Sequence, residues 1–167
     1  MSHFLPARAL TSTAPRAPHS RIGIGLSATS QPLLDRLLQS GQILEAHRAQ
    51  EAINELLTGH WLPETTLLFV GAVGAVTRLI APLIQGKEQD PAVLVLDPQG
   101  QWVIPLLGGH SSFAEQRARE LAEMLQASPV LTGACATDQR LALDAFGDGW
   151  GWQRSGSSPA WRELMQK

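Results

Sequence analysis

The most continuous hydrophobic pattern in the chain lies in residues 66–84, TLLFVGAVGAVTRLIAPLI. Residues 67–70 form an uninterrupted apolar run, as expected of a strand that is buried on both faces. After Gly71 and Gly74 the apolar residues follow helical spacing, at Val76, Leu79, Ile80, Leu83 and Ile84. The pattern predicts a buried strand, a glycine turn and a helix. Pro82 should kink that helix or begin a second short turn, because proline is poorly tolerated in a helix interior.

Weaker patterns of the same kind precede this segment. Residues 21–27, RIGIGLS, predict a short strand whose glycines permit close packing. A helix is expected over about 32–40, with Pro32 in its first turn, followed by a short strand within 42–47. A second helix is expected over 49–57, with Gly59 just past its end. The predicted buried faces of these two helices are Leu33, Leu34, Leu37 and Leu38, and Ala52, Ile53, Leu56 and Leu57.

A hairpin follows the central segment. Residues 92–96 and 102–106 are apolar strand patterns, and Asp97-Pro98-Gln99-Gly100 between them has the residue preferences of a type I turn. A helix after residue 110 and a short strand over 129–132 complete the chain order. The predicted buried face of that helix consists of Ala114, Ala118, Leu121, Ala122 and Leu125. Together the elements predict a three-layer, Rossmann-like α/β fold, with a mostly parallel sheet and one antiparallel hairpin.

Composition limits the class of protein. The chain has 167 residues, of which 44% are apolar and 17% charged, so it is globular and long enough for a real core. A net charge of −2 gives no electrostatic case for nucleic acid binding. Cys135 is the only cysteine, which excludes a disulfide framework. No apolar run reaches the length of a membrane-spanning helix. We therefore expect a soluble protein of a reducing compartment, the cytoplasm.

Three regions are expected along the chain. Residues 1–20, rich in Ala, Ser, Thr and Pro, predict a disordered extension, although their composition is also compatible with a transit peptide. Residues 21–140 should form the α/β domain. Residues 141–167 should be a tail or linker that contains three of the five tryptophans. Rings this dense seldom stay in water, so we expect the tail to dock on the domain or on a partner.

Two strand–glycine–helix junctions are the candidate functional features. At Gly71 and Gly74 a helix start leaves unpaired N–H groups and the positive end of the helix dipole, which favour an anion. Arg78 adds a cation suited to a carboxylate or phosphate. The alternative is that the glycines only make the turn, as they do in many α/β folds.

The second junction consists of Gly108, Gly109 and His110. An imidazole at a helix start can transfer protons near neutral pH, but it can equally be a polar capping residue. We expect both junctions at the same edge of the sheet, where they would share one site. Ser111 and Ser112 lack a nucleophile-elbow pattern, so a serine hydrolase is rejected. The early glycines lack the third glycine and the acidic residue of a dinucleotide-binding fingerprint, so that alternative is disfavoured.

Three segments carry a family resemblance when taken in order and at their spacing: FVGAVGAVTRLIAPLI, DPAVLVLDPQGQWVIPLLGGH and SPVLTGACATD. They resemble the cobalamin-biosynthesis family CbiG, the cobalt-precorrin 5A hydrolases. The resemblance covers roughly residues 21–138, which correspond to the N-terminal and middle parts of that family. It implies opening of the ring A δ-lactone of a cobalt-bound corrinoid, with release of a two-carbon fragment as acetaldehyde. This step belongs to the anaerobic branch of vitamin B12 synthesis.

The resemblance also implies roles for individual residues. His110 would be the catalytic acid or base. The residues that would bind the substrate carboxylates and the macrocycle are Gly71, Gly74, Arg78, Gly108 and Gly109. No cofactor and no protein-bound metal are expected, because cobalt arrives within the substrate. The expected partners are the cobalt-corrinoid substrate and a separate C-terminal-type domain or a corrinoid methyltransferase, with no nucleic acid and no membrane.

Two departures from the family pattern bear on these roles. After the histidine the family usually continues with a glycine pair, Ala and Asn, whereas this chain has Ser112, Phe113, Ala114 and Glu115. The sequence also stops where family members continue into a C-terminal domain. The alternative function is therefore a non-catalytic corrinoid-binding or accessory module of the same pathway.

Overall fold

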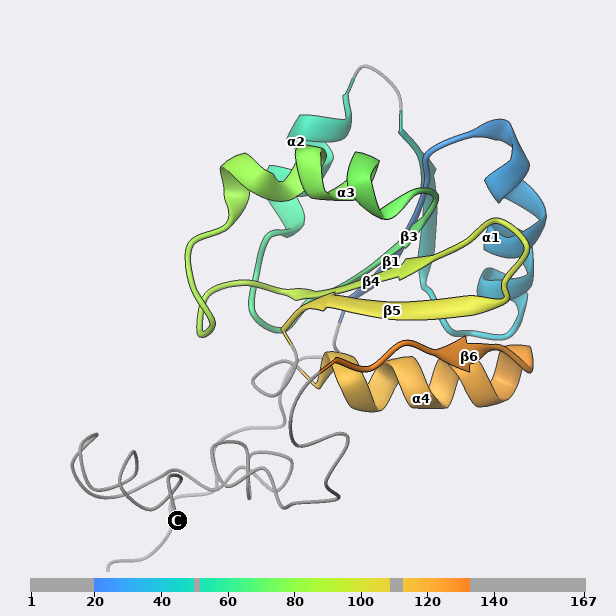
Figure 1. Ribbon diagram of the computed structural model, residues 1–167. Helices are drawn as coiled ribbons and strands as arrows, with labels where there is room; N and C mark the ends of the chain where they lie inside the picture. The colour runs from blue at the N-terminus through green and yellow to red at the C-terminus, as the bar shows by residue number, and fades with distance from the viewer. Residues whose placement is uncertain (1–19, 50–51, 109–112, 133–167) are drawn as a thin grey trace, which may run out of the picture.

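A computed structural model describes residues 20–49, 52–108 and 113–132 of the chain. Its centre is a six-stranded sheet with the strand order β2-β1-β3-β4-β5-β6 (Figure 1). Neighbouring strands are parallel except for the antiparallel pair β4–β5. The strands are β1 (Arg21–Gly25), β2 (Glu45–Arg48), β3 (Thr66–Val70), β4 (Ala92–Leu96), β5 (Trp102–Leu107) and β6 (Ser128–Pro129). The predicted fold class is confirmed, including its single hairpin.

Helices cover both faces of the sheet and complete three layers. They are α1 (Gln31–Gln39), α2 (Ile53–His60), α3 (Val73–Ile80) and α4 (Ala114–Leu125), with 3₁₀ turns η1 (Ala28–Ser30) and η2 (Ala81–Leu83). Helices α1 and α4 pack on one face, while α2 and α3 pack on the other (Figure 1). Pro82 lies in η2, directly after α3, so the predicted break at this proline is confirmed.

The two central strands lie between both layers, which explains their continuous apolar sequence. Every residue of β3 and of β4 is buried. Because side chains alternate along a strand, Leu68 and Val70 join the core beneath α1 and α4, while Leu67 and Phe69 join the core beneath α2 and α3.

Strand β1 is held close to helix α1 by its glycines. A Cβ atom on Gly23 would collide with Ile43 and Leu34, and one on Gly25 would lie 2.8 Å from Leu34 and 2.9 Å from Ser30. These two glycines therefore allow the close packing that the sequence predicted, and a nucleotide is not needed to explain them.

The β4–β5 turn is formed by the chemistry of one aspartate. Gly100 N–H donates to the Asp97 carbonyl over 2.9 Å, and Gly100 has φ +68°. The Asp97 carboxylate accepts from the N–H groups of Gln101 at 2.8 Å and Trp102 at 2.6 Å. Such side chain–backbone bonds favour a turn, and they explain why this segment was readily predicted.

Most deviations from the predicted elements concern the edge of the sheet near β2. Helix α2 runs four residues later than predicted at its start, so Gly59 lies inside it, and among its predicted buried residues only Leu57 is fully buried. Leu57 packs with residues of β1 and β3, whereas a hollow lies between this helix and the edge strand β2. Leu38 of α1 was also predicted to be buried, but it is 43% exposed.

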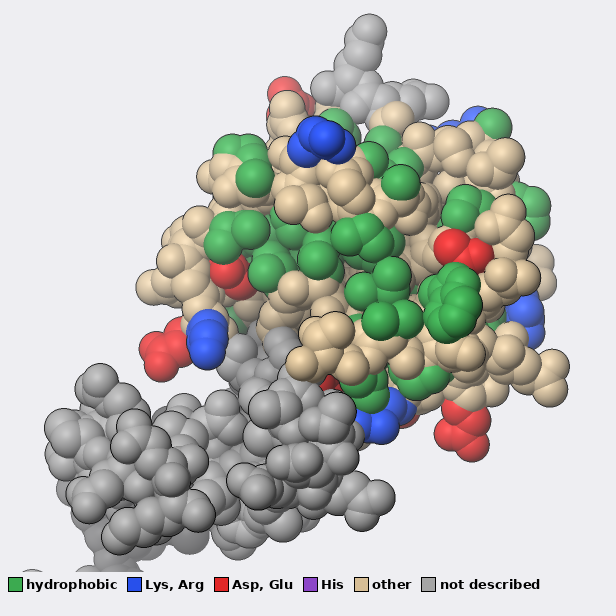
Figure 2. Space-filling model, viewed as in Figure 1, with side chains coloured by type: hydrophobic (Ala, Val, Ile, Leu, Met, Phe, Trp, Pro, Cys, Tyr) green, Lys and Arg blue, Asp and Glu red, His purple; other side chains and the backbone are tan. Residues whose placement is uncertain are grey.

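Hydrophobic side chains also remain on the surface near α3 and β5. Figure 2 shows them gathered on the viewed face, and the exposed large ones include Val73 at 36%, Ile84 at 45% and Trp102 at 48%. None of the described helices is both long enough and apolar enough to cross a membrane. The predicted extension and tail fall, apart from Ser20, outside the described residues.

Candidate functional site

The first candidate junction is the passage from β3 to α3. Gly71 follows the last residue of β3, and its N–H donates to the Leu96 carbonyl over 2.9 Å. Helix α3 then begins at Val73, with Ala72 as its N-cap, and no side chain caps it. Residues 72–75 are exposed. The helix start therefore presents free N–H groups and the positive dipole end to solvent, as the sequence predicted.

Arg78 lies beside this helix start although it belongs to the last turn of α3. Its Nη1 donates to the Gly74 carbonyl over 3.1 Å, and its side chain is exposed. Long side chains on a helix point toward its N-terminus, which explains how a residue one turn further along reaches back to Gly74. The cation and the uncapped amides thus lie together. Their role in binding stays a prediction.

The two glycines of this junction have different structural reasons. A Cβ on Gly71 would lie 2.8–2.9 Å from three atoms of the Leu26 side chain. Leu26 is fixed there because its N–H donates to the Val70 carbonyl over 3.0 Å. A Cβ on Gly74 would meet only Arg78 Nη1, at 3.5 Å. Gly71 is therefore explained by packing, whereas the space over Gly74 is open to a ligand.

The second junction joins β5 to α4. Gly108 has φ +78°, and its carbonyl accepts the N–H of Ala114 over 3.1 Å. A residue with a side chain is strained at such an angle, so glycine is needed here by the backbone. Phe113, the N-cap of α4, also has a left-handed φ of +57°. Gly109 and His110 lie outside the described residues, so the predicted roles of both stay predictions.

The two junctions lie at opposite ends of the sheet, and the expectation of a shared edge is wrong. Val70 of β3 pairs with Leu96 at the carboxyl end of β4, whereas Leu107 of β5 pairs with Val93 near the amino end of β4. The hairpin reverses β5, so its last residue lies where β3 and β4 begin (Figure 1). The five residues of β3 separate the two ends by roughly 15 Å along the strand.

Two arginines at the Gly108 end were not singled out from the sequence. Arg21 begins β1 and Arg117 lies in the first half of α4, and both line one narrow hollow. Burial lowers the pKa of Arg117, the nearby charge of Arg21 lowers this pKa further, and Glu120 opposes both effects. The two arginines are 96 positions apart in the chain, so no local pattern could reveal their proximity.

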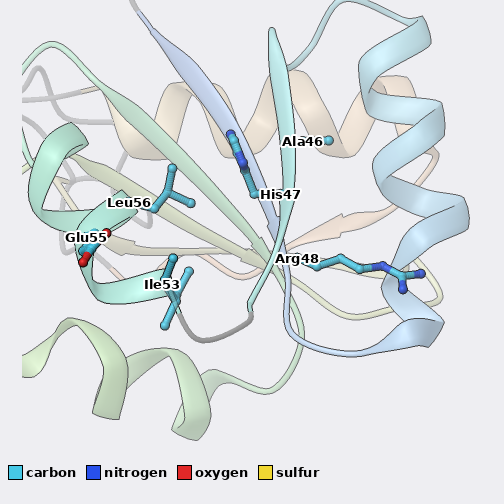
Figure 3. A pocket seen from close by; sticks show the side chains of 7 residues that line it. Ala46, His47, Arg48, Ile53, Glu55 and Leu56 are labelled. Atoms are coloured by element: carbon cyan, nitrogen blue, oxygen red, sulfur yellow. The ribbon is translucent and has the colours of Figure 1, made fainter.

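A further hollow lies between β2 and α2, and none of the predicted site residues lines it. It has a volume of about 510 Å³ and is lined by Ala46, His47, Arg48, Ala52, Ile53, Glu55 and Leu56. His47 points into it beside Leu56, while Arg48 points to the opposite side of β2 (Figure 3). His47 Nε2 is 3.2 Å from Glu45 Oε2, and Arg48 Nε donates to Gln31 Oε1 over 3.0 Å. Within the described ranges, no group of three His, Cys, Asp or Glu residues is placed to hold a metal ion.

Comparison with known proteins agrees with the resemblance seen in the sequence. The family model "Cobalamin synthesis G N-terminal" matches residues 55–136. A cobalt-precorrin-5A hydrolase from Salmonella typhimurium strain LT2 is 49% identical over 82 residues, which are 49% of this chain and 23% of that enzyme. A cobalt-precorrin-5A hydrolase from Priestia megaterium is 42% identical over 86 residues, 52% of this chain and 23% of the enzyme.

A solved structure gives the same result at the level of the fold. The crystal structure of a cobalamin biosynthesis protein G homologue from Sulfolobus solfataricus is similar with a TM-score of 0.58 and 30% sequence identity. The similarity covers 69% of this chain and 37% of that one. The matched part of the present chain thus spans about a quarter of the length of the two hydrolases.

The chain has the fold of a Rossmann-like α/β module, similar to that of the Sulfolobus solfataricus homologue. More particularly, residues 55–136 match the model of the cobalamin synthesis G N-terminal family. This region extends from within α2 through β6, and so contains both candidate junctions.

Proposed function

We propose that this chain acts in cobalamin biosynthesis as the N-terminal part of a cobalt-precorrin-5A hydrolase. In this proposal water opens the ring A lactone of the corrinoid, a two-carbon fragment leaves as acetaldehyde, and a further domain or partner completes the active assembly. Cobalt enters as part of the substrate, with no separate cofactor. A cytoplasmic location stays a prediction.

The observation that carries this proposal is the 49% and 42% identity to two cobalt-precorrin-5A hydrolases. Identity at this level is concentrated in one stretch of 82–86 residues, which supports a common role for that stretch. The stretch is only 23% of either hydrolase, which is why the proposal includes a further domain or partner.

Because the two junctions lie at opposite ends of the sheet, their residues would have different roles in the reaction. A single lactone can lie at only one end of the sheet. We place it at the β5–α4 end, where His110 would take the proton of the attacking water or donate one to the leaving oxygen. Gly108 and Gly109 would let the macrocycle approach the backbone. Gly74 and Arg78, at the other end, would bind an anionic group that does not react.

The decisive experiment is a release assay with cobalt-precorrin 5A. The full chain is incubated with this corrinoid, alone and with a polypeptide comprising the rest of the Priestia megaterium hydrolase, and acetaldehyde is measured. We expect release in the complemented mixture, in proportion to lactone opening. The intact hydrolase serves as the positive control. If it releases acetaldehyde and the complemented mixture does not, the hydrolase proposal is wrong.

A second candidate function is a non-catalytic corrinoid-binding module. The observation that favours it is the distance between Arg78 and the Gly108 end, because the predicted shared site does not form. The same mixture separates the two functions. A chain that binds the corrinoid, yet gives no acetaldehyde when complemented, is a binding module.

A further inference from the structure

A narrow hollow opens at the amino ends of β1 and β3, on the face of the sheet that α4 covers. Leu68 and Leu121 form its apolar part, and its polar residues are Arg21, Gln42, Thr66, Arg117 and Glu120. Its volume is about 10 Å³, room for one water molecule. A larger group would therefore be held at the mouth, where the long side chains end.

The lining of this hollow brings together two arginines and one carboxylate. Arg21 is fixed by β1, whose first residue pairs with Thr66, and Arg117 is fixed by the N–H bond to Phe113 O in the first turn of α4. Both are partly buried.

Glu120 is the acidic residue of the hollow, and it is exposed. Its Oε1 accepts a hydrogen bond from Gln116 Nε2 over 2.8 Å, which directs it along the helix surface. Its charge raises the pKa of Arg117, but burial and the charge of Arg21 outweigh it. The hollow therefore has an excess of one positive charge, and the two guanidinium groups repel each other.

We propose that Arg21 and Arg117 form a binding site for an oxyanion, the carboxylate or phosphate group of a small molecule. The planar guanidinium offers paired donors that match the two oxygens of such a group. Gln42 and Thr66 add an amide and a hydroxyl at the same hollow. An anion at the mouth would balance the excess positive charge of the lining.

The position of this site bears on the reaction. It lies at the end of the sheet where β5 ends at Gly108, whereas Arg78 lies at the other end. If the proposed function is right, the bound oxyanion is a peripheral carboxylate of the corrinoid, and Arg21 and Arg117 are the cations on the reacting side. That assignment rests on the proposed function; the oxyanion site itself does not.

The site is tested by thermal unfolding of the full chain in sodium phosphate or sodium acetate, with sodium chloride keeping the ionic strength constant. At saturating phosphate or acetate the Tm should rise by about 3 °C, because the anion binds only the folded state. Arg117→Met should lose this rise. Without the anion it should melt about 2 °C higher than the unmodified chain, because a partly buried charge is removed while the aliphatic stem is kept. Arg119→Met, an exposed arginine of the same helix, should keep the full response.

Glu120→Gln sharpens the result, since it removes the carboxylate that competes with the anion. Phosphate should then bind about fivefold more tightly, a change of about 1 kcal/mol. If phosphate and acetate change the Tm of the unmodified chain and of Arg117→Met equally, the proposed site is wrong. It is also wrong if Glu120→Gln binds phosphate more weakly than the unmodified chain.

A competition experiment tests whether the bound oxyanion is a carboxylate of the corrinoid. Cobyrinic acid, a cobalt corrinoid with free carboxylates, should displace phosphate from the unmodified chain. Displacement supports the carboxylate assignment. If phosphate and acetate bind through Arg117 but the corrinoid does not displace them, the oxyanion site is retained, and its assignment to the substrate is overturned.

Discussion

The two ends of the sheet carry similar sequence patterns but are built for different reasons. At the β3–α3 end the glycine after the strand makes room for a side chain, since a Cβ on Gly71 would collide with Leu26. At the β5–α4 end the glycine after the strand supplies a backbone angle, since Gly108 has φ +78°. Glycine after a buried strand is therefore required for two different structural reasons, and only the three-dimensional structure distinguishes them.

The ends also differ in how they present positive charge. Arg78 is exposed and lies against the first turn of α3, next to amides that no side chain caps. Arg21 and Arg117 are partly buried and lie beside each other. An exposed arginine loses little by having no partner, whereas a partly buried pair gains much from a bound anion. The comparison suggests that the Gly108 end is the more specialised of the two.

The largest effect is expected at the end that carries His110. His110→Ala should slow acetaldehyde release by about a hundredfold or more in the complemented mixture, because the proton acceptor or donor is lost. The release rate and the corrinoid affinity are measured together, and affinity should change little. His60→Ala, a histidine in the last turn of α2, is the control. An active His110→Ala variant with an unchanged rate would show that this histidine only caps the helix.

A smaller effect, on binding, is expected at the opposite end. Arg78→Ala should weaken corrinoid affinity by about tenfold, the loss of one charge-assisted pair. The affinity is measured by titration with a cobalt corrinoid. Arg119→Ala, an exposed arginine on α4, controls for the general loss of positive charge. Unchanged affinity in Arg78→Ala would remove the β3–α3 end from the substrate site and leave the function to the Gly108 end alone.

The sequence was most informative where residues are buried on both sides or bonded to their own backbone. Every residue of β3 and β4 is buried, so a continuous apolar run identified both strands. All five residues predicted for the buried face of α4 are buried. The β4–β5 turn was predictable because Asp97 bonds the N–H groups of the residues that follow it. In these elements the local sequence contains the physical cause of the structure.

The sequence was least informative where distant residues decide the arrangement. The shared edge was inferred from a rule for parallel strands, although the predicted hairpin already reverses β5. Because β5 is antiparallel to β4, the predicted hairpin already implied that Gly108 lies at the opposite end of the sheet from Gly71. The Arg21–Arg117 pair depends on how α4 packs against the sheet, which no local pattern contains.

Within the β3–α3 end, Gly71 is packed against Leu26 whereas the space over Gly74 is open, and this difference predicts opposite effects on stability. Gly71→Ala should lower the free energy of unfolding by about 1–3 kcal/mol, since the new methyl group must displace Leu26. Gly74→Ala should raise it by about 0.5 kcal/mol, because alanine favours a helix and the space is open. Urea denaturation measures both. If Gly74→Ala stabilises the fold but weakens corrinoid binding, the open space over Gly74 is used by the ligand; equal destabilisation by both changes would contradict the distinction.

A modest effect is expected at the two ends of α4, where two residues other than glycine have a left-handed backbone. Phe113 precedes the helix with φ +57°, and Gln126 follows it with φ +58°. Gln126 N–H bonds the Ala122 and Glu123 carbonyls, and Ala127 N–H bonds Ala122 O, a helix end that glycine suits best. Gln126→Gly should therefore raise the free energy of unfolding by about 1 kcal/mol.

Phe113→Gly introduces the residue type that the resembling family has at this position, and it removes the same backbone strain. It should raise the free energy of unfolding by only about 0.5 kcal/mol, because the partly buried ring is lost at the same time. The difference between the two variants, measured by urea denaturation, is thus the contribution of the Phe113 ring. A loss of stability of more than 1 kcal/mol in Phe113→Gly, with a gain in Gln126→Gly, would mean that the ring holds the start of α4 in place. Phe113 would then replace the family's glycine as a structural element of the β5–α4 junction.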